Sequence, residues 1–144
     1  MKNKSVLWAM LGLSVVGILD SFYLTIIHFS QNELVCTIIE GCDVVLKSAY
    51  SEIGPISTAA LGVLFYITVF YIVLLYISGK TSDVLMNKLV WVFALGFAAS
   101  LFFLYLQMFV IKAYCQYCIL SLITSTLLFV LFFFKEKSKN KYES

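Results

Sequence analysis

Tyr114-Cys115-Gln116-Tyr117-Cys118-Ile119-Leu120 is the stretch that decides the organisation of this chain, because it places a Cys-x-x-Cys pair at the start of a long apolar run. Two thiols at this spacing can close a small disulfide ring or hold a metal ion. If the pair opens a helix, the positive end of the helix dipole favours the thiolate of its first cysteine. The other two cysteines, Cys36 and Cys42, lie far upstream. The chemistry therefore depends on whether the thiols meet, and on which side of a membrane.

Composition predicts that the chain is embedded in a membrane. The 144 residues are 62% hydrophobic and 12% charged, whereas a soluble domain carries about 25% charge. Apolar runs cover 6–27, 56–77, 89–111 and 113–134, each close to the roughly 20 residues that a helix needs to cross a bilayer. The first run is too long for a signal-peptide core and has no clear cleavage site after it. We expect an all-α, single-domain (1–144), integral membrane four-helix bundle in contact with lipid.

The lysines predict the orientation of this bundle. Eight of them lie before the first run, between the second and third, or after the fourth: Lys2, Lys4, Lys80, Lys88, Lys135, Lys137, Lys139 and Lys141. Only Lys47 and Lys112 lie on the other side. The positive-inside bias puts both termini and the tail 135–144 in the cytoplasm, and the loop 28–55 and all cysteines on the outer face of the cell membrane. Lysines beside membrane segments, without a patch of exposed aromatics, do not indicate nucleic-acid binding.

The outer loop 28–55 is too short for a core of its own and is expected to cover the helix ends. The segment 42–52 contains Val44, Val45, Leu46 and Tyr50 among polar residues, which predicts a short amphipathic helix at the membrane interface. Asp43 in its first turn would favour that helix.

Several kinds of site could use four cysteines. Buried structural thiols, two inert disulfides and a four-thiolate zinc site are the alternatives to redox chemistry. The spacing of Cys36 and Cys42 does not match the usual close spacing of zinc ligands. Outer-face thiols lie in the oxidising compartment where disulfides persist. We favour redox chemistry and keep as the alternative a non-enzymatic metal-binding membrane protein, a sensor or assembly factor.

A redox role needs a route for electrons. Thiol–disulfide exchange passes through mixed disulfides, so a loop pair can hand electrons to a pair fixed at a helix end. Cys36 and Cys42 lie on the loop, and Cys115 and Cys118 at the helix end. Two electrons that arrive at the membrane surface need a membrane-soluble acceptor, for which a quinone within the bundle would serve.

The order of these features resembles the vitamin K epoxide reductase (VKOR) family, in particular its bacterial members without a fused thioredoxin-like domain. The resemblance runs from the first to the fourth apolar run. It rests on Cys36, on Cys42-Asp43-Val44-Val45-Leu46-Lys47-Ser48, on Gly54-Pro55-Ile56, on Gly62 with Phe65-Tyr66, and on Cys115-Gln116-Tyr117-Cys118. The DsbB family of quinone-linked thiol oxidases has the reverse order, with its Cys-x-x-Cys in the first outer loop.

The resemblance implies a role for each cysteine. Cys118 would be the thiolate that faces the quinone, and Cys115 its disulfide partner. Cys42 would attack Cys115, and Cys36 would form the mixed disulfide with a thioredoxin-fold (DsbA-like) extracytoplasmic protein. The chain would thus be a quinone-dependent thiol-disulfide oxidoreductase that supports disulfide bond formation, with a menaquinone or ubiquinone type of acceptor and no metal.

Two further positions follow from the same resemblance. Ser48 matches a serine or threonine near the family's active site, a candidate hydrogen-bond donor to a quinone oxygen or to the thiolate. Leu122 stands where the animal enzymes have a tyrosine, so the resemblance does not extend to their vitamin K epoxide chemistry.

Three features within the apolar runs remain open. Asp20 is either a functional acid or a structural one that is protonated or hydrogen-bonded, because an acid in a membrane segment is expensive. Gln107 predicts a hydrogen bond between helices rather than a ligand contact. Six aromatic residues near the Cys-x-x-Cys pair either line a quinone pocket or face lipid: Phe102, Phe103, Tyr105, Phe109, Tyr114 and Tyr117.

Overall fold

The computed structural model describes residues 2–30, 41–49, 52–53 and 55–143. Its long helices are α1 (Lys2–Ser30), α3 (Thr58–Ile77), α4 (Asp83–Tyr105) and α5 (Gln116–Glu143). Within this described part, four helical stretches are long and apolar enough to cross a bilayer. The structure confirms the all-α fold with four transmembrane helices, and the chain is a multi-pass membrane protein.

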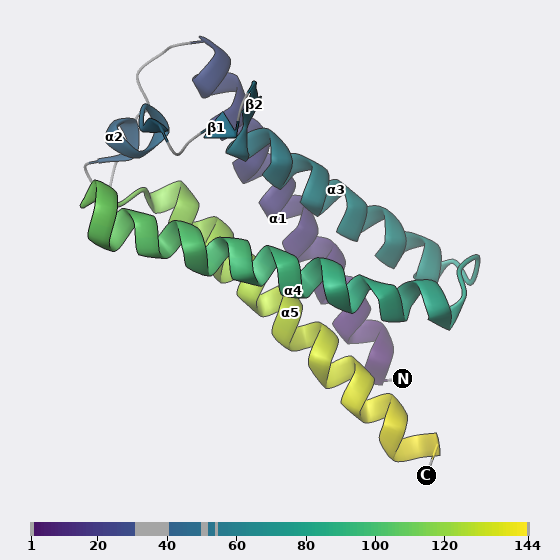
Figure 1. The fold of residues 1–144 in the computed structure, drawn as a ribbon. Helices are drawn as coiled ribbons and strands as arrows, with labels where there is room; N and C mark the ends of the chain where they lie inside the picture. Colours follow the sequence, from purple (N-terminus) through teal and green to yellow (C-terminus); the bar gives the residue numbers. More distant parts are fainter. Residues whose placement is uncertain (1, 31–40, 50–51, 54, 144) are drawn as a thin grey trace.

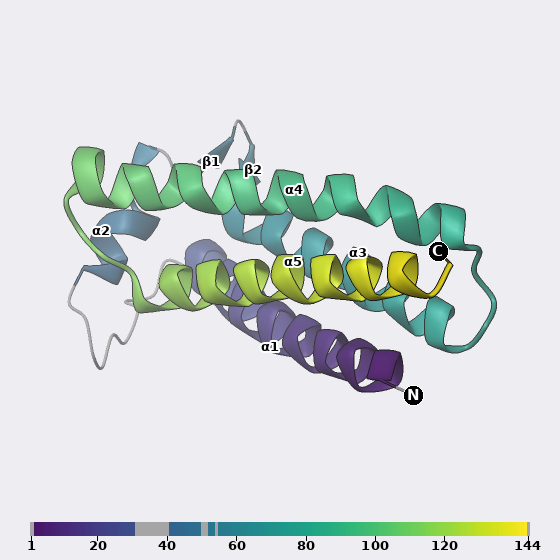
Figure 2. The same ribbon diagram turned by 90° about the horizontal axis from the view of Figure 1, so that it is seen from below.

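The two ends of the bundle differ in what they carry. Both chain ends and the connection between α3 and α4 lie at one end (Figure 1). The short helix α2 (Cys42–Leu46), the strands β1 (Glu52–Ile53) and β2 (Ile56–Ser57), and the connection into α5 lie toward the other (Figure 1). A view from below shows the same division (Figure 2). The described cysteine-bearing segments therefore share one end of the molecule.

A two-stranded hairpin delays the start of the second long helix. β1 and β2 pair antiparallel, with Glu52 opposite Ser57 and Ile53 opposite Ile56. The first two residues of the apolar run 56–77 are therefore extended, and α3 begins at Thr58 rather than at residue 56. α2 occupies the start of the segment for which we predicted an interfacial helix. Its position at a membrane interface stays a prediction.

The last two helices also differ from the predicted ranges. α4 begins at Asp83 instead of residue 89, with Ser82 as the extended N-cap residue and an acid in the first turn to favour the helix dipole. Its end widens into the π-helix η2 (Leu106–Ile111), and Lys112 turns the chain with a left-handed φ of 54°. α5 therefore begins at Gln116, not at residue 113.

α5 continues beyond the membrane segment that we predicted. It runs to Glu143, through most of the segment 135–144 that we assigned to a tail. Lysine and glutamate, which dominate this segment, are good helix formers, so the helix extends past its apolar part.

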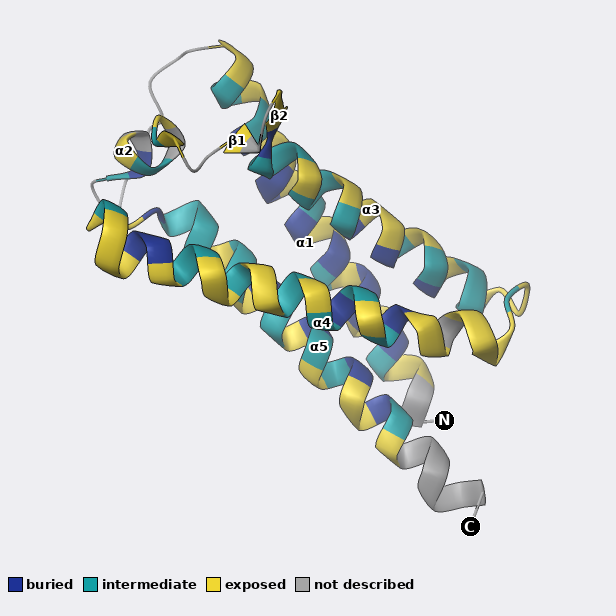
Figure 3. Cartoon of the chain, viewed as in Figure 1, coloured by how far each residue is buried: buried dark blue, intermediate teal, exposed yellow. Residues whose placement is uncertain are grey.

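The distribution of apolar side chains suits a lipid environment. The core is formed by side chains from all four long helices, among them Met10, Tyr66, Phe93 and Leu128. Many other large apolar residues face outward, as the yellow segments of Figure 3 show on every long helix; Trp91 is 77% exposed. Without water around the bundle, these outward side chains contact lipid tails.

Glycines let the helices approach closely at two crossings. A Cβ atom on Gly17 of α1 would collide with the ring of Tyr66 on α3. A Cβ atom on Gly96 of α4 would lie 2.6 Å from the ring of Phe65. Small residues at helix interfaces are the usual means of close packing in membranes. They bring α1, α3 and α4 together beneath the end that carries the cysteines.

Candidate redox site at the cysteine-bearing end

The Cys-x-x-Cys pair lies at the N-terminus of α5. Cys115 directly precedes the helix, is fully buried, and accepts a hydrogen bond on its carbonyl oxygen from the Ile119 amide at 3.0 Å. The Cys115 amide donates to Oε1 of Gln107 in η2 at 3.1 Å. The π-helix at the end of α4 thus holds the start of α5, and Gln107 makes the hydrogen bond between helical segments that we predicted.

The two thiols of the pair are not equivalent. A hydrogen bond from the Cys118 thiol lowers the pKa of Cys115, and the amides of Tyr117 and Cys118 add to this, against burial and the nearby Asp20, which both act in the opposite direction. These amides are the unpaired donors of the first helical turn. The lowered pKa favours the thiolate form of Cys115, as expected for the first cysteine at a helix start.

Cys42 lies against this pair. It is fully buried and packs with Leu24 of α1 and with Cys115 in one cluster. The preceding Gly41 has φ 133°, and a Cβ atom there would lie 3.1 Å from the carbonyl oxygen of Tyr114. The backbone before Cys42 therefore packs closely against the backbone before Cys115, with little room for a side chain at residue 41.

The redox state of the three described cysteines differs. Cys42 is disulfide-bonded, whereas Cys115 and Cys118 are free thiols. Cys36 lies outside the described residues, so its predicted role is untested. Among the described residues, no group of three or more His, Cys, Asp or Glu side chains could hold a metal ion.

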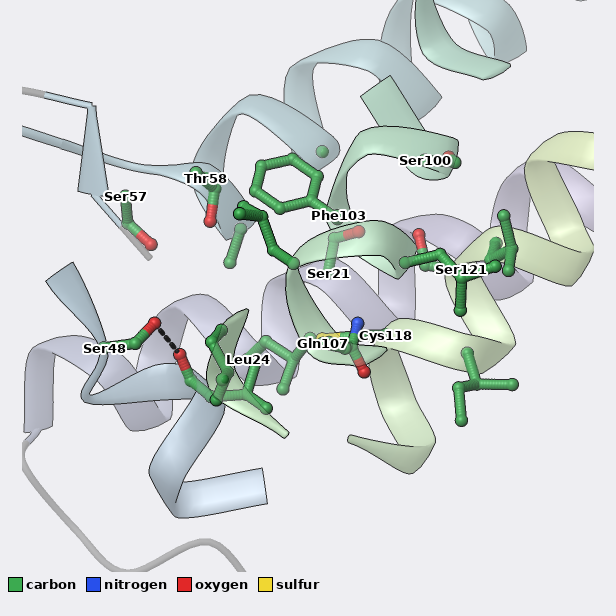
Figure 4. A pocket seen from close by; sticks show the side chains of 18 residues that line it. Ser21, Leu24, Ser48, Ser57, Thr58, Ser100, Phe103, Gln107, Cys118 and Ser121 are labelled. Carbon is green, nitrogen blue, oxygen red and sulfur yellow. Dashed lines mark hydrogen bonds between the residues drawn. The ribbon is translucent and has the colours of Figure 1, made fainter. Parts of the chain in front are cut away.

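A cavity of about 130 Å³ lies beside the pair, between all four long helices and the α2 segment (Figure 4). Its walls are largely apolar, with Leu24, Phe103, Ile111 and Leu122 among them, and Cys118 contributes its side chain while Cys115 does not. Polar groups reach the cavity from several elements: Ser21, Ser48, Ser57, Thr58, Ser100, Gln107 and Ser121. A cavity on the order of 150 Å³ can hold a benzene ring, so the space suits one ring of a flat apolar molecule with polar substituents.

Ser48 lies at the edge of this cavity, as Figure 4 shows. Its hydroxyl donates to the carbonyl oxygen of Val45 at 2.7 Å. A serine hydroxyl has one hydrogen to donate. Donation to a ligand or to a thiolate, the role that the family resemblance implies, would require this bond to Val45 to break.

Of the six aromatic residues that we considered as cavity walls, only Phe103 lines the cavity. Phe102, Tyr105 and Phe109 point outward and are each more than half exposed. Tyr117 packs its ring against that of Tyr23 on α1. The lipid-facing interpretation is therefore correct for the exposed ones.

Sequence reasoning missed several residues that line the cavity. Ser21, Ser100 and Ser121 come from three different helices, and nothing in their local sequence joins them. Gly62 on α3 also lines the cavity, where a Cβ atom would lie 2.9 Å from Oγ of Ser21. The available signal was the occurrence of serine in otherwise apolar runs, which marks either a helix contact or a polar cavity.

Asp20 lies deep in the bundle close to the same site. Its side chain is 7% exposed, and within the described residues neither carboxylate oxygen has a hydrogen-bond partner. One turn before it on α1, Gly17 lies against the ring of Tyr66, and one turn after it, Leu24 packs with Cys115. Of the expectations for Asp20, the hydrogen-bonded structural acid therefore does not apply within the described residues, whereas a protonated structural acid and a functional acid both remain.

A membrane bundle with a Cys-x-x-Cys pair at a helix start, a third cysteine packed against it and an apolar cavity beneath defines a thiol-redox membrane protein. The model of the vitamin K epoxide reductase family matches residues 8–133. The chain belongs to this family, and it is a membrane thiol oxidoreductase. No curated protein matches the chain by sequence.

Proposed function

We propose that this protein oxidises the thiols of an extracytoplasmic thioredoxin-fold partner and passes the electrons to a membrane quinone. The route runs from the partner through Cys36, Cys42, Cys115 and Cys118. The observation that carries the proposal is the burial of Cys42 against Cys115 in one cluster, with Cys118 next to them and in the cavity wall. Disulfide exchange needs thiols that can approach one another. This arrangement suits the exchange between Cys42 and Cys115 and the bond between Cys115 and Cys118.

The different surroundings of Cys115 and Cys118 fit this direction of electron flow. Cys115 faces Cys42 rather than the cavity, so it is suited to exchange with the loop pair. Cys118 faces the cavity, so it is suited to the step with the acceptor. The lowered pKa of Cys115 also makes it a good leaving group when the mixed disulfide between Cys42 and Cys115 is opened by attack on Cys42.

The residues around the cavity fit a quinone of the menaquinone or ubiquinone type. Its ring is flat and apolar, which suits Phe103, Leu122 and the aliphatic walls. Its carbonyl oxygens accept hydrogen bonds, for which serine, threonine and glutamine side chains at the cavity are suitable donors. When bound, the quinone would accept two electrons. Ser48 remains a candidate donor to it.

The proposed orientation places both termini in the cytoplasm and the cysteines on the outer face of the cytoplasmic membrane. Eight of the ten lysines then lie on the cytoplasmic side, as the positive-inside rule requires. The partner would reach the protein from the extracytoplasmic side, where disulfides are formed.

The test uses purified protein in lipid nanodiscs with a reduced thioredoxin-fold protein and a short-chain quinone. Wild-type protein should reduce the quinone, and Cys118→Ala should abolish this activity, because no disulfide can then form in the pair. Cys42→Ala should accumulate the partner as a mixed disulfide on Cys36. Quinone reduction that survives Cys118→Ala would disprove the mechanism, and a partner trapped on Cys115 would show that the relay order is wrong.

A further inference from the structure

Asp20 occupies a position between the redox pair and a hydroxyl pair deeper in the bundle. Gly17, one turn before it on α1, lies against the ring of Tyr66. Leu24, one turn after it, packs with Cys115. Residues three and four apart share a helix face, so Asp20 is on the face of α1 that looks toward both groups.

The carboxyl group of Asp20 lacks the partners of a structural acid. Its two oxygens are buried and without hydrogen bonds within the described residues. A buried polar group that makes no hydrogen bond destabilises the fold, and acids inside membrane segments usually pair with another group or serve in proton relays. The described residues supply no such partner, so packing among them gives no reason for an acid at this position.

Titratable groups of two other helices pack against this face of α1. Tyr66 comes from α3, and Cys115 and Cys118 come from the start of α5. The Tyr66 hydroxyl lies 2.8 Å from Oγ of Ser121 and 3.0 Å from its carbonyl oxygen. Ser121 lines the cavity that Cys118 also lines. Asp20 thus lies on a helix face that packs near the thiols of the pair. The hydroxyl groups of Ser21 and Ser121 are at the cavity.

We propose that Asp20 is the proton-transfer residue of the Cys-x-x-Cys pair, a role that rests on the proposed function. Oxidation of the pair forms the S–S bond, breaks both S–H bonds and passes two electrons to the quinone, which takes up two protons. Asp20 accepts the proton of Cys118 through a water molecule, because neither of its oxygens has a hydrogen-bond partner among the described residues, and releases it toward the cavity for one quinone oxygen. Cys115 gives its proton to water at the outer end, and water supplies the second proton for the quinone.

The test is a single turnover of the reduced protein in nanodiscs, without partner, with a short-chain quinone. Asp20→Asn keeps the shape of the side chain but cannot carry the proton, so the rate of quinone reduction should fall about 10²-fold or more. Asp20→Glu retains a carboxyl group and should keep most of the rate. Reduction of the oxidised pair by dithiothreitol should be unchanged in both variants.

A second measurement needs no quinone. We expect the alkylation rate of Cys118 in wild-type protein to depend on pH in two steps, because a thiol and a carboxyl group that exchange a proton, as we propose, titrate together. Asp20→Asn should remove one step. A structural acid would instead change thermal stability and leave the shape of this profile unaltered.

The outcomes separate the two proposals. If wild-type protein reduces no quinone, the proposed function fails. If wild-type protein does so and Asp20→Asn is equally fast, the role of Asp20 is refuted while the function stands. If Asp20→Asn and Asp20→Glu are equally slow and both keep the two-step profile, Asp20 acts through the fold and the proposal is wrong.

Discussion

At the residue scale, the two cysteines of one motif have different environments although they are three positions apart. Cys115 is held outside the first turn of α5, where backbone amides and the Cys118 thiol point at its sulfur. Cys118 is inside the helix and turned to the cavity. The division follows from the helix starting between them, since a residue before the first turn receives the unpaired amides.

This arrangement predicts how the pH dependence of Cys115 reactivity responds to substitution. A lowered pKa keeps Cys115 a thiolate, and therefore reactive, at pH values below those at which an ordinary cysteine loses its reactivity. Cys118→Ala removes the strongest cause of the lowering, so the midpoint of the alkylation rate should move to higher pH. Alkylation of Cys115 by iodoacetamide across pH, followed by mass spectrometry, measures this midpoint.

Cys118→Ser is the matched control for this measurement. Its hydroxyl can still donate a hydrogen bond to the Cys115 sulfur, so its midpoint should lie between those of the wild-type protein and Cys118→Ala. Identical midpoints in all three proteins would show that Cys118 does not influence Cys115.

At the element scale, the crossing of α1 and α3 positions the cavity and Asp20. The ring of Tyr66 lies on Gly17, and its hydroxyl reaches Ser121 on α5. One side chain therefore joins three helices directly beneath the redox site. At the cysteine-bearing end, the π-helix η2 links the end of α4 to the start of α5, because Gln107 accepts a hydrogen bond from the Cys115 amide.

The crossing predicts the effect of adding one methyl group at Gly17. Gly17→Ala would force the Tyr66 ring to move, because its Cβ atom would overlap the ring. Overpacking of this kind costs about 1–3 kcal/mol. Thermal unfolding in detergent should show the loss.

Gly12→Ala provides the control on the same helix, since nothing lies within 4 Å of the added atom. It should leave stability unchanged or raise it slightly, because alanine is the better helix former by about 0.5–1 kcal/mol. If Gly17→Ala is as stable as Gly12→Ala, the close crossing of α1 and α3 is wrong.

At the scale of the whole molecule, the bundle separates its charged end from its redox end. The chain termini and the α3–α4 connection share one end (Figure 1). Cys42, Cys115 and Cys118 belong to the opposite end, with the cavity just inside it. In the proposed function, such a division gives the membrane-soluble acceptor and the extracytoplasmic partner access to the same small cluster.

The lysine distribution predicts the direction in which this molecule crosses the membrane. A reporter that is active only in the cytoplasm should be active when fused after Ser144, and inactive when inserted in the outer loop between β1 and β2, at Pro55. A reporter active only outside should give the opposite pattern. Activity reversed at both positions would place the cysteines in the cytoplasm and would contradict the proposed partner.

The sequence by itself determined the fold class, because four runs of about 20 apolar residues can satisfy their backbone groups in a bilayer only as helices. It also determined the chemistry of the site, because the four cysteines and the position of the second pair at a helix start are local features. Its helix bounds were less accurate at the hairpin Ile56–Ser57 and at Lys112, where backbone pairing and a left-handed turn override the apolar pattern.

Only the tertiary structure decided which residues surround the redox pair. Ser21, Ser100 and Ser121 meet at one cavity because their helices are rotated and crossed in one particular way, and helix rotation is set by packing across the whole bundle. The same holds for Asp20, whose sequence allowed a paired structural acid. Whether a described residue pairs with its carboxyl group depends on what α3 and α5 place around it, which no local pattern records.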